Sequence, residues 1–487
     1  MSSQSARAVN EPGAARGARP GGPEPGPARA RPGGLLLLGI SLGYFMVLLD
    51  TTVVTVALPA IGDDLSGSLS GLQWVSNGYT LTFAALLLTA GALSDRYGGR
   101  KVFVAGLWLF AAFSGASAAV GSLGALIALR ALLGVAGALL LPTSLAIIAH
   151  AFTEPAARAR AMGAWAAISG SALAAGPLVG GVLSDTLGWR AIFLINVPVA
   201  LLSLALVVRH APANVPGAAR GLDLPGQTTA VLALTALTYG LIESGAEGWG
   251  SWQVLGSFAL FLVSALLFVA AERRTPTPRR APMLPLGMFR ERTLSSGLFA
   301  GLLVNFGLSG VLFVLSLSFQ EAHGHSAFTT GLLFLPLTLP TAFNPVLTGR
   351  LVARIGARRP AVAGFLLMGT GALVQSAATS DGDSTAALVT TCAGLLVMGF
   401  GVSFAIPPLM TAIVGSVPRE QSGIASGALN SARQTGAVLG VSVLGAVIGS
   451  GTPDGTGTRY ALLTAALALL AGAGVVAAWL GRPGAGK

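Results

Sequence analysis

The stretch Gly91-Ala-Leu-Ser-Asp-Arg-Tyr-Gly-Gly-Arg-Lys101 is a short polar segment, spaced by glycines, between two long apolar runs. The pattern returns at Gly349-Arg-Leu-Val-Ala-Arg-Ile-Gly-Ala-Arg-Arg359, which keeps the same spacing of Gly, Leu, Arg, Gly and Arg and also lies between apolar runs. Two copies of one loop pattern predict a duplicated helical bundle in a membrane. The second copy has Ala353 where the first has Asp95, so we expect the two halves to be inequivalent.

The composition indicates a membrane protein. The chain has 487 residues, of which 53% are hydrophobic and 10% are charged, whereas about 25% of the residues of a soluble globular chain are charged. A net charge of +11 is also found in proteins that bind nucleic acid. Here, however, almost every Lys and Arg lies beside an apolar run on alternate loops, which is the positive-inside pattern of membrane proteins. No nucleic-acid partner is therefore expected.

Apolar runs of about 18 to 25 residues are long enough to cross a bilayer as helices. The chain has about fourteen of them, which predicts fourteen spans in an all-α integral membrane protein. They lie near residues 34–58, 72–92, 102–120, 123–148, 161–183, 191–208, 228–242, 252–271, 294–319, 329–348, 361–378, 386–413, 424–448 and 460–480.

Loop charges predict the orientation of the spans. Cations such as Arg158 and Arg160 gather in the loops after even-numbered spans, whereas acids such as Asp63, Asp64 and Glu321 gather in the opposite loops. This distribution places both termini in the cytoplasm and requires an even number of spans. The first residues of the chain have no apolar core, so they predict a disordered tail rather than a signal peptide.

The two copies of the loop follow the second and the tenth predicted spans. This leaves six plus six spans related by duplication, with an inserted pair between them, and such symmetry places substrate sites near the midplane between the halves. The predicted division is a disordered basic cytoplasmic tail at 1–33, a six-helix bundle at 34–210, two inserted helices at 211–272, a cytoplasmic linker at 273–293 and a second six-helix bundle at 294–482.

Asp50 is the most informative single residue. It lies about sixteen residues into the first span, roughly 24 Å from its start at 1.5 Å per residue. A carboxylate within the hydrocarbon region is costly and by default marks an ion or proton pathway. We therefore predict that Asp50 couples transport to protons; the alternative is a structural acid near a helix end that a partner neutralises.

Arg130 is the predicted partner of Asp50. The fourth span runs in the opposite direction, so Arg130 lies at a depth similar to that of Asp50. Its guanidinium group would keep the carboxylate charged until the pathway opens, or would take part in the proton route. The alternative is a purely architectural salt bridge.

These features resemble the major facilitator superfamily, and specifically its fourteen-span drug:proton antiporter branch. The segment 91–101 matches the signature G-x-L-x-D-R-x-G-x-[RK]-[RK], and the segment 49–59 is similar to the first-span pattern, with Thr55 where Asn is usual. The fourth-span pattern R-x-x-Q-G-x-G is kept only in part, because Leu133 stands where Gln is usual and Ala136 where Gly is usual.

The fifth span is similar to the signature associated with antiport. Its small residues let another backbone approach, and its proline bends the helix, so we expect tight packing that closes a leak path between the halves. Generic helix packing is the alternative. The residues of this signature are Gly170, Gly176, Pro177, Gly180 and Gly181.

The resemblance implies that the loop 91–101 forms a gate against the equivalent helix of the second half, near Ser422. Asp95 would accept hydrogen bonds from that helix N-terminus and favour the state closed to the cytoplasm. The alternative is that the loop charges only fix the topology. The predicted gating residues are Gly91, Asp95, Arg96, Gly98, Arg100 and Lys101.

The thirteenth predicted span carries three polar residues, Asn430, Arg433 and Gln434, among small ones. Arg433 lies about a dozen residues deep, so it should face the interior of the bundle or water. We expect these side chains to contribute polar groups to a cavity. The sequence does not identify the partner of Arg433.

The resemblance implies a monomeric antiporter of the cell membrane that exports hydrophobic or cationic drugs by alternating access. The proton gradient would supply the energy, without a cofactor. The sequence has no constellation of catalytic residues, no metal spacing among its His residues and no phosphate-binding loop, so neither an enzyme nor an ATP-driven pump is expected. The alternatives are a symporter or uniporter for a small metabolite, and a membrane scaffold or receptor that transports nothing.

Overall fold

The computed structural model describes residues 33–212, 221, 223–273, 283–378, 384–418, 421–449 and 456–481, and within these ranges every regular element is a helix. The first bundle consists of α1 (Gly34–Leu65), α2 (Leu69–Tyr97), α3 (Gly99–Ser117), α4 (Leu123–Ala151), α5 (Pro155–Leu187), α6 (Ala191–Leu194) and α7 (Asn196–His210). It is followed by the hairpin of α8 (Leu224–Glu247) and α9 (Trp252–Glu272). The second bundle consists of η1 (Leu286–Arg290), α10 (Arg292–Leu317), η2 (Ser318–Ala322), α11 (Ala327–Leu333), α12 (Leu335–Ile355), α13 (Arg358–Ala378), α14 (Thr385–Gly415), α15 (Ser422–Gly449) and α16 (Thr456–Trp479).

In the part of the chain that the structure describes, eleven segments are long and apolar enough to cross a membrane, or twelve if the bent pair α11 and α12 is one span. The predicted all-helical membrane architecture is confirmed, whereas the prediction of fourteen spans is not. Helices α2 and α3 do not pass the same test. Gln73 and Asn77 in α2, and Arg100 and Lys101 in α3, lower their mean hydropathy.

Two predicted spans are interrupted in the structure. The span predicted at 191–208 consists of α6 and α7, which Ile195 separates. The span predicted at 329–348 begins at Ala327 and bends by 45° between α11 and α12. Pro336 explains this bend, because proline has no N–H group to donate to the carbonyl four residues earlier.

The predicted tail at 1–33 lies outside the described residues except for Gly33, and the predicted linker at 273–293 is described only at Arg273 and from residue 283 onward.

The repeated loop forms the same kind of turn in both bundles. Gly98 separates α2 from α3 with φ of 86°, and Gly356 follows α12 with φ of 78°. These angles lie in the left-handed region, which glycine adopts without the steric cost of a Cβ atom. The glycine of the duplicated pattern is therefore required by the backbone at both places.

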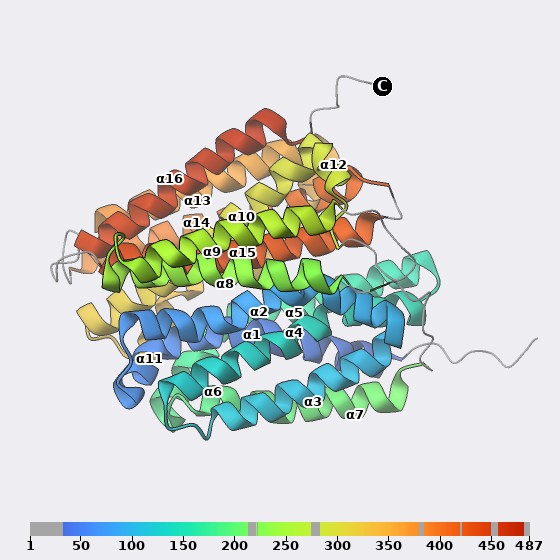
Figure 1. Cartoon of the computed structure of the whole chain (residues 1–487), viewed down its shortest axis with the longest axis horizontal. Coiled ribbons are helices and arrows are strands. Elements are labelled where there is room, and N and C mark those ends of the chain that lie inside the picture. The colour runs from blue at the N-terminus through green and yellow to red at the C-terminus, as the bar shows by residue number, and fades with distance from the viewer. Residues whose placement is uncertain are drawn as a thin grey trace, which may run out of the picture.

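Each bundle has its own hydrophobic core, and the two cores interlock. Phe313 and Val441 of the second bundle belong to the core of the first, and Val56 of α1 belongs to the core of the second. In Figure 1 the helices of the first bundle, in blue, cyan and green, lie below those of the second, in yellow to red.

The hairpin of α8 and α9 lies in front of the junction between the bundles (Figure 1). Helix α8 contacts both α2 and α15, and Gln227 on α8 donates a hydrogen bond to the carbonyl oxygen of Ala85 at 3.0 Å. The far side of the hairpin is apolar: Leu262 and Leu266 on α9 are 59% and 71% exposed. Such a surface is stable against lipid chains but not against water.

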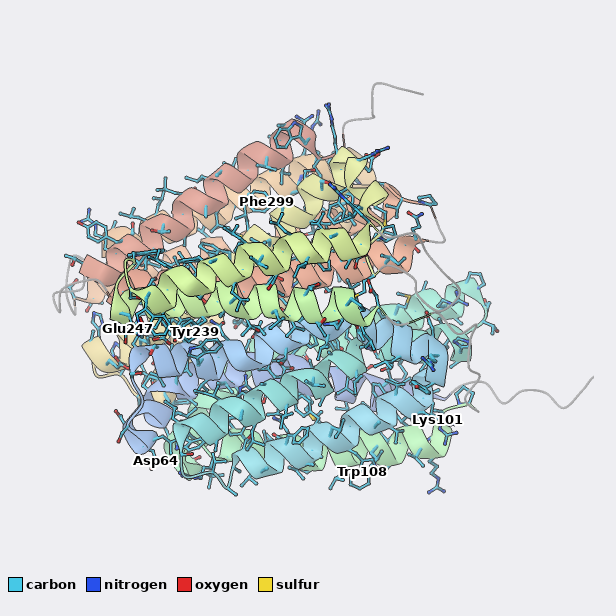
Figure 2. The ribbon with its side chains drawn as sticks, viewed as in Figure 1. Asp64, Lys101, Trp108, Tyr239, Glu247 and Phe299 are labelled. Atoms are coloured by element: carbon cyan, nitrogen blue, oxygen red, sulfur yellow. The ribbon has the colours of Figure 1, made fainter. Side chains whose placement is uncertain are left out.

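Figure 2 shows which of the labelled residues lie at each end of the helix bundle. Lys101 lies at one end, and Asp64 and Glu247 lie at the opposite end. We call these the Lys101 end and the Asp64 end. Trp108, which is 56% exposed, points away from the bundle between them, where a membrane would surround it.

Candidate functional site

Asp50 and Arg130 form a buried ion pair inside the first bundle. Their side chains are 1% and 2% exposed, and an Arg130 Nη atom contacts the Asp50 carboxylate. The second carboxylate oxygen of Asp50 accepts a hydrogen bond from the side-chain amide of Asn196 at 3.0 Å. The structure therefore brings together the two residues that the sequence predicts as partners, and adds an amide from α7.

Arg130 is held from several sides. Its Nε donates to the carbonyl oxygen of Val75 at 3.1 Å, and its guanidinium carbon lies 4.6 Å from the centre of the Tyr79 ring and 6.0 Å from that of Phe193. A guanidinium over an aromatic face is attracted by the negative potential of the ring. These contacts fix the position from which Arg130 meets Asp50.

Asn196 links the ion pair to a second polar group. Its Nδ2 also contacts the hydroxyl oxygen of Ser114 at 3.1 Å, and that hydroxyl donates to the carbonyl oxygen of Phe193 at 2.8 Å. The sequence predicts no role for Asn196 or Ser114. A lone amide or hydroxyl in an apolar run is a weak signal, since many such groups bond to their own helix. Only the packing of α7 against both α1 and α3 shows their position.

The glycines of α5 contact both bundles. Gly176 and Gly180 lie against Thr52 and Val53 of α1, so closely that an added Cβ at Gly180 would meet the carbonyl oxygen of Val53 at 2.8 Å. Close approach of two backbones is what small residues in membrane helices permit. This face of α5 packs within the first bundle.

Gly181 lies on another face of α5 and packs against the second bundle. A Cβ added there would meet the Cα atom of Phe328 at 2.7 Å, and α11 in turn presents Gly331 to Pro177. The predicted signature thus includes a contact between the two bundles. Gly170 differs, because a Cβ at this position would have no atom within 4 Å.

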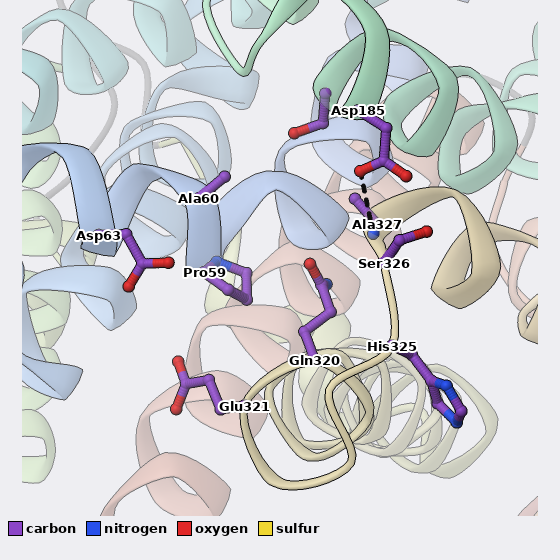
Figure 3. A pocket seen from close by; sticks show the side chains of 10 residues that line it. Pro59, Ala60, Asp63, Asp185, Gln320, Glu321, His325, Ser326 and Ala327 are labelled. Carbon is purple, nitrogen blue, oxygen red and sulfur yellow. Dashed lines mark hydrogen bonds between the residues drawn. The ribbon is translucent and has the colours of Figure 1, made fainter.

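Asp185 adds a polar contact at the same junction. Its carboxylate accepts hydrogen bonds from the backbone N–H groups of Ala327 at 3.2 Å and Phe328 at 2.9 Å, in the first turn of α11 (Figure 3). A carboxylate stabilises a helix N-terminus by satisfying free N–H groups and by favourable interaction with the helix dipole. The first bundle therefore caps a helix of the second.

Further hydrogen bonds join the bundles near the Asp64 end. Ser316 donates to the carbonyl oxygen of Thr55 at 2.7 Å, and Gln320 donates to that of Val56 at 2.9 Å. Gln73 on α2 donates to two carbonyl oxygens of α15. The hydrogen bonds between described residues of the two bundles lie at the Asp64 end or at middle depth, and not at the Lys101 end. These contacts therefore close the Asp64 end.

A cavity of about 460 Å³ lies beside this closure. Figure 3 shows Asp63 and Glu321 on its left side and Asp185 above it. All three carboxylates are exposed, and a group of exposed acids at the end of a helix bundle is ordinary for a solvated surface. Among the residues that the structure describes, no group of three or more His, Cys, Asp or Glu is arranged to hold a metal ion.

Asp95 is exposed at the Lys101 end, where it makes no hydrogen bond or ion pair with any described residue. Arg96 lies over the ring of Tyr97 at 5.3 Å, and Arg100 donates to the carbonyl oxygen of Val208 at 2.7 Å. The predicted latch between Asp95 and the helix that begins at Ser422 is therefore not engaged in this conformation.

Arg433 on α15 lies at middle depth. Its Nε donates to the side-chain oxygen of Asn305 on α10 at 3.2 Å, and the Asn305 amide lies 3.4 Å from the side-chain oxygen of Gln434. Asn305 is thus the partner that the sequence analysis left open. Asn430 donates to the carbonyl oxygen of Ser426 one turn earlier in its own helix and does not join this group.

A profile of the Major Facilitator Superfamily matches residues 40–441. The chain belongs to this superfamily. The helices α1 to α15 that hold the Asp50 pair, the α5 glycines and the duplicated loop all lie within or overlap the matched region.

Two curated members of the superfamily are similar over most of their length. The tetracenomycin C resistance and export protein of Streptomyces glaucescens is 36% identical over 419 residues, which are 86% of this chain and 76% of that protein. The methylenomycin A resistance protein of Bacillus subtilis is 35% identical over 438 residues, which are 90% and 92% of the two chains. Among solved structures, the human organic anion transporter MFSD10 superposes with a TM-score of 0.63 at 18% identity, over 91% of this chain and 99% of that one.

Proposed function

We propose that the chain is an efflux transporter that exports small organic compounds in exchange for protons by alternating access. Curated relatives are named as antibiotic resistance and export proteins, which supports export as the direction of transport. The observation that carries the proposal of proton coupling is the buried Asp50 carboxylate, held by Arg130 and Asn196. No other Asp or Glu among the described residues is buried near the middle of a long helix.

The proposed cycle uses the contacts between the bundles. A proton reaching Asp50 neutralises the carboxylate and weakens its attraction to Arg130, and loss of the proton restores the pair. Because α1 carries both Asp50 and the residues that contact α10 and α5, a change at Asp50 can alter the closure at the Asp64 end. Alternating access requires an equilibrium between two conformations that protonation shifts.

We propose fourteen spans, with the Lys101 end in the cytoplasm. Helices α2 and α3 each pack along α4 in the first bundle, which supports counting them as spans despite their polar residues. Lys101 lies at one end (Figure 2), and Arg96 and Arg100 lie beside it where α2 meets α3, as the positive-inside rule predicts for a cytoplasmic face. The two separate cores and the α8–α9 hairpin support a division into six, two and six helices.

With this orientation, the structure represents a conformation closed to the outside. The Gly181 and Asp185 contacts lie at the outer end, and Asp95 has no partner among the described residues at the cytoplasmic end. Asp95 would then act in the opposite conformation, by capping the helix that begins at Ser422. This arrangement mirrors the cap that Asp185 provides for α11.

Export is tested by comparing the accumulation of a panel of antibiotics in cells with and without the transporter. We expect lower accumulation of at least one compound in expressing cells, and recovery of accumulation when the proton gradient is collapsed. Higher accumulation in expressing cells would favour uptake by a symporter. Accumulation that does not differ for any compound would favour a protein that transports nothing.

Asp95→Ala should shift the transporter toward the conformation that is open to the cytoplasm. The expected effect is about tenfold or more on the ratio of the two conformations, since a charged hydrogen bond contributes roughly 1.5–3 kcal/mol. Distances between spin labels at the cytoplasmic ends of α2 and α15 measure this ratio. Ala353→Ser, at the equivalent position of the second loop, is the control and should leave the distances unchanged. Equal distributions for Asp95→Ala and the unmodified protein would contradict the latch.

A further inference from the structure

Arg433 carries a positive charge that is paired with no carboxylate among the described residues of the second bundle. From residue 292 onward the acidic residues are Glu321, Asp381, Asp383, Glu420 and Asp454, and none of them belongs to one of the α-helices numbered α10 to α16. Glu321 lies in η2 at the Asp64 end, about four turns beyond the Asn305 position that Arg433 contacts. The only described partner of the guanidinium is therefore a neutral amide oxygen.

The carboxylate of the first bundle does not serve Arg433 either. Asp50 is already bound by Arg130 and by the amide of Asn196, through both of its oxygens. The interior of the two bundles thus contains one carboxylate and two guanidinium groups among its described residues. A charge within a membrane protein is costly unless it is paired, and rare cations inside spans mark binding sites or ion pathways.

Aromatic side chains of the first bundle lie at the same depth as Arg433. Tyr44 on α1 and Trp165 on α5 stack with ring centres 5.0 Å apart and an angle of 10° between their planes. Both lie ten residues from the start of their helices, and Arg433 lies eleven residues from the start of α15. At 1.5 Å per residue, all three are roughly 15 Å from the Lys101 end.

The stacked rings and the guanidinium group are near one another in space. Arg433 lies within electrostatic reach of the Tyr44 hydroxyl group across the two bundles. Tyr44, Trp165, Arg433 and Gln434 are all partly exposed, although they lie at middle depth. The indole N–H of Trp165 is buried and has no acceptor, and an unpaired buried donor is itself unfavourable.

We propose that this group of residues binds an aromatic acid, with the flat ring against Tyr44 and Trp165 and the anionic oxygen toward Arg433. Asn305 and Gln434 hold the guanidinium in place from the second bundle. The inference rests on the proposed export function, and it specifies the substrate as a planar anion. It differs from the expectation of a hydrophobic or cationic drug in the sign of the charge, because the described residues of the interior have an excess of positive charge. An anion bound between the bundles would contact both, which is how a substrate biases the two conformations.

Binding of three matched probes tests this inference without transport. The probes are naphthoate, its neutral amide and naphthylmethylammonium, which share one ring system and differ in charge. Their affinities are measured by microcalorimetry on the purified full-length transporter at neutral pH, without a proton gradient. We expect naphthoate to bind about tenfold or more tightly than the other two, as one charged hydrogen-bonded contact provides.

Two variants of Arg433 separate charge from structure. Arg433→Gln should lower the affinity for naphthoate about tenfold or more and remove the preference among the probes. Arg433→Lys keeps the charge and should retain the preference, although it loses the bidentate geometry. Gel filtration and thermal unfolding identify any variant that does not fold, and in that case Tyr44→Leu replaces it, with an expected loss of affinity for all three probes.

Three results would overturn the inference: stronger binding of the ammonium probe, equal preference in the unmodified protein and Arg433→Gln, or binding of none of the probes. Asp50→Asn distinguishes this inference from the proposed function. It should keep the preference for naphthoate while it loses proton-driven transport. Loss of the preference with intact proton coupling would contradict the site and leave the export proposal standing.

Discussion

Replacing Asp50 by Asn should abolish proton-driven export, with a fall in the transport rate of at least about tenfold. Asparagine has the same shape but cannot take up and release a proton, and no other carboxylate among the described residues lies at this depth. The rate is measured as accumulation of an exported compound in everted membrane vesicles after an imposed pH gradient. Exchange of labelled for unlabelled substrate should continue, because it needs no net movement of protons.

The matched control for this variant lies on the same helix. Asp64→Asn also replaces an aspartate that is paired with an arginine, but Asp64 and Arg190 are 45% and 41% exposed, and exposed pairs contribute little. We expect near-normal transport from it. Asp50→Asn leaves Arg130 without its counter-ion, which costs about 3–5 kcal/mol when a buried pair is broken. Thermal unfolding must therefore show a folded variant, and proton-driven transport by such a variant would contradict the role of Asp50.

Gly181→Leu should prevent closure of the Asp64 end. The new side chain would meet the backbone of α11 at Phe328, and backbone cannot move aside as a flexible side chain can. Overpacking of this kind costs typically about 1–3 kcal/mol, which is enough to shift a two-state equilibrium about five- to 150-fold. The expected result is a strong decrease in export, together with greater exposure of the α5–α11 junction from the outside.

Labelling at Thr330 measures that exposure. Thr330 is fully buried on α11 and its hydroxyl has no partner, so Thr330→Cys removes no hydrogen bond; Cys392→Ser removes the native thiol. A membrane-impermeant maleimide should react faster in Gly181→Leu than in the parent protein. Gly170→Leu on the same helix is the control, because nothing lies within 4 Å of a Cβ there. Equal labelling in the two glycine variants would contradict the proposed closure.

The Asp50 pair could be predicted from sequence because a charge inside an apolar run is costly, and because depth follows directly from position in a helix. Both charged residues are conspicuous, and the rise per residue places them at one level. Asn196 and Ser114 lie at the same site but could not be assigned, since neutral polar groups in a helix have local partners available.

The contacts between the bundles depend on packing that no local pattern contains. Asp185 resembles an ordinary acid at a helix end until α11, 142 residues further along the chain, is seen beneath it. The α5 signature predicted close packing, but its partners differ: Gly180 faces α1, Gly181 faces α11, and Gly170 faces neither. The count of fourteen spans is not confirmed, because polar and charged residues in α2 and α3 lower the mean hydropathy of these two helices.

Arg433 shows how sequence and structure complement each other. The sequence alone establishes that the second bundle has no acidic residue within its long helices after Arg292. The structure adds the amide of Asn305 beside the guanidinium, and the stacked Tyr44 and Trp165 at the same depth. Only the two observations together predict that the site around Arg433 prefers an aromatic anion.

The central claim, that export is coupled to protons through Asp50, is tested most directly by proton movement driven by substrate. Purified transporter is reconstituted in liposomes that contain a pH-sensitive dye, and a gradient of an exported compound is imposed without a pH gradient. We predict that outward movement of the compound drives protons inward with the unmodified protein and with Asp64→Asn, but not with Asp50→Asn. Proton movement of equal size in Asp50→Asn would contradict the claim.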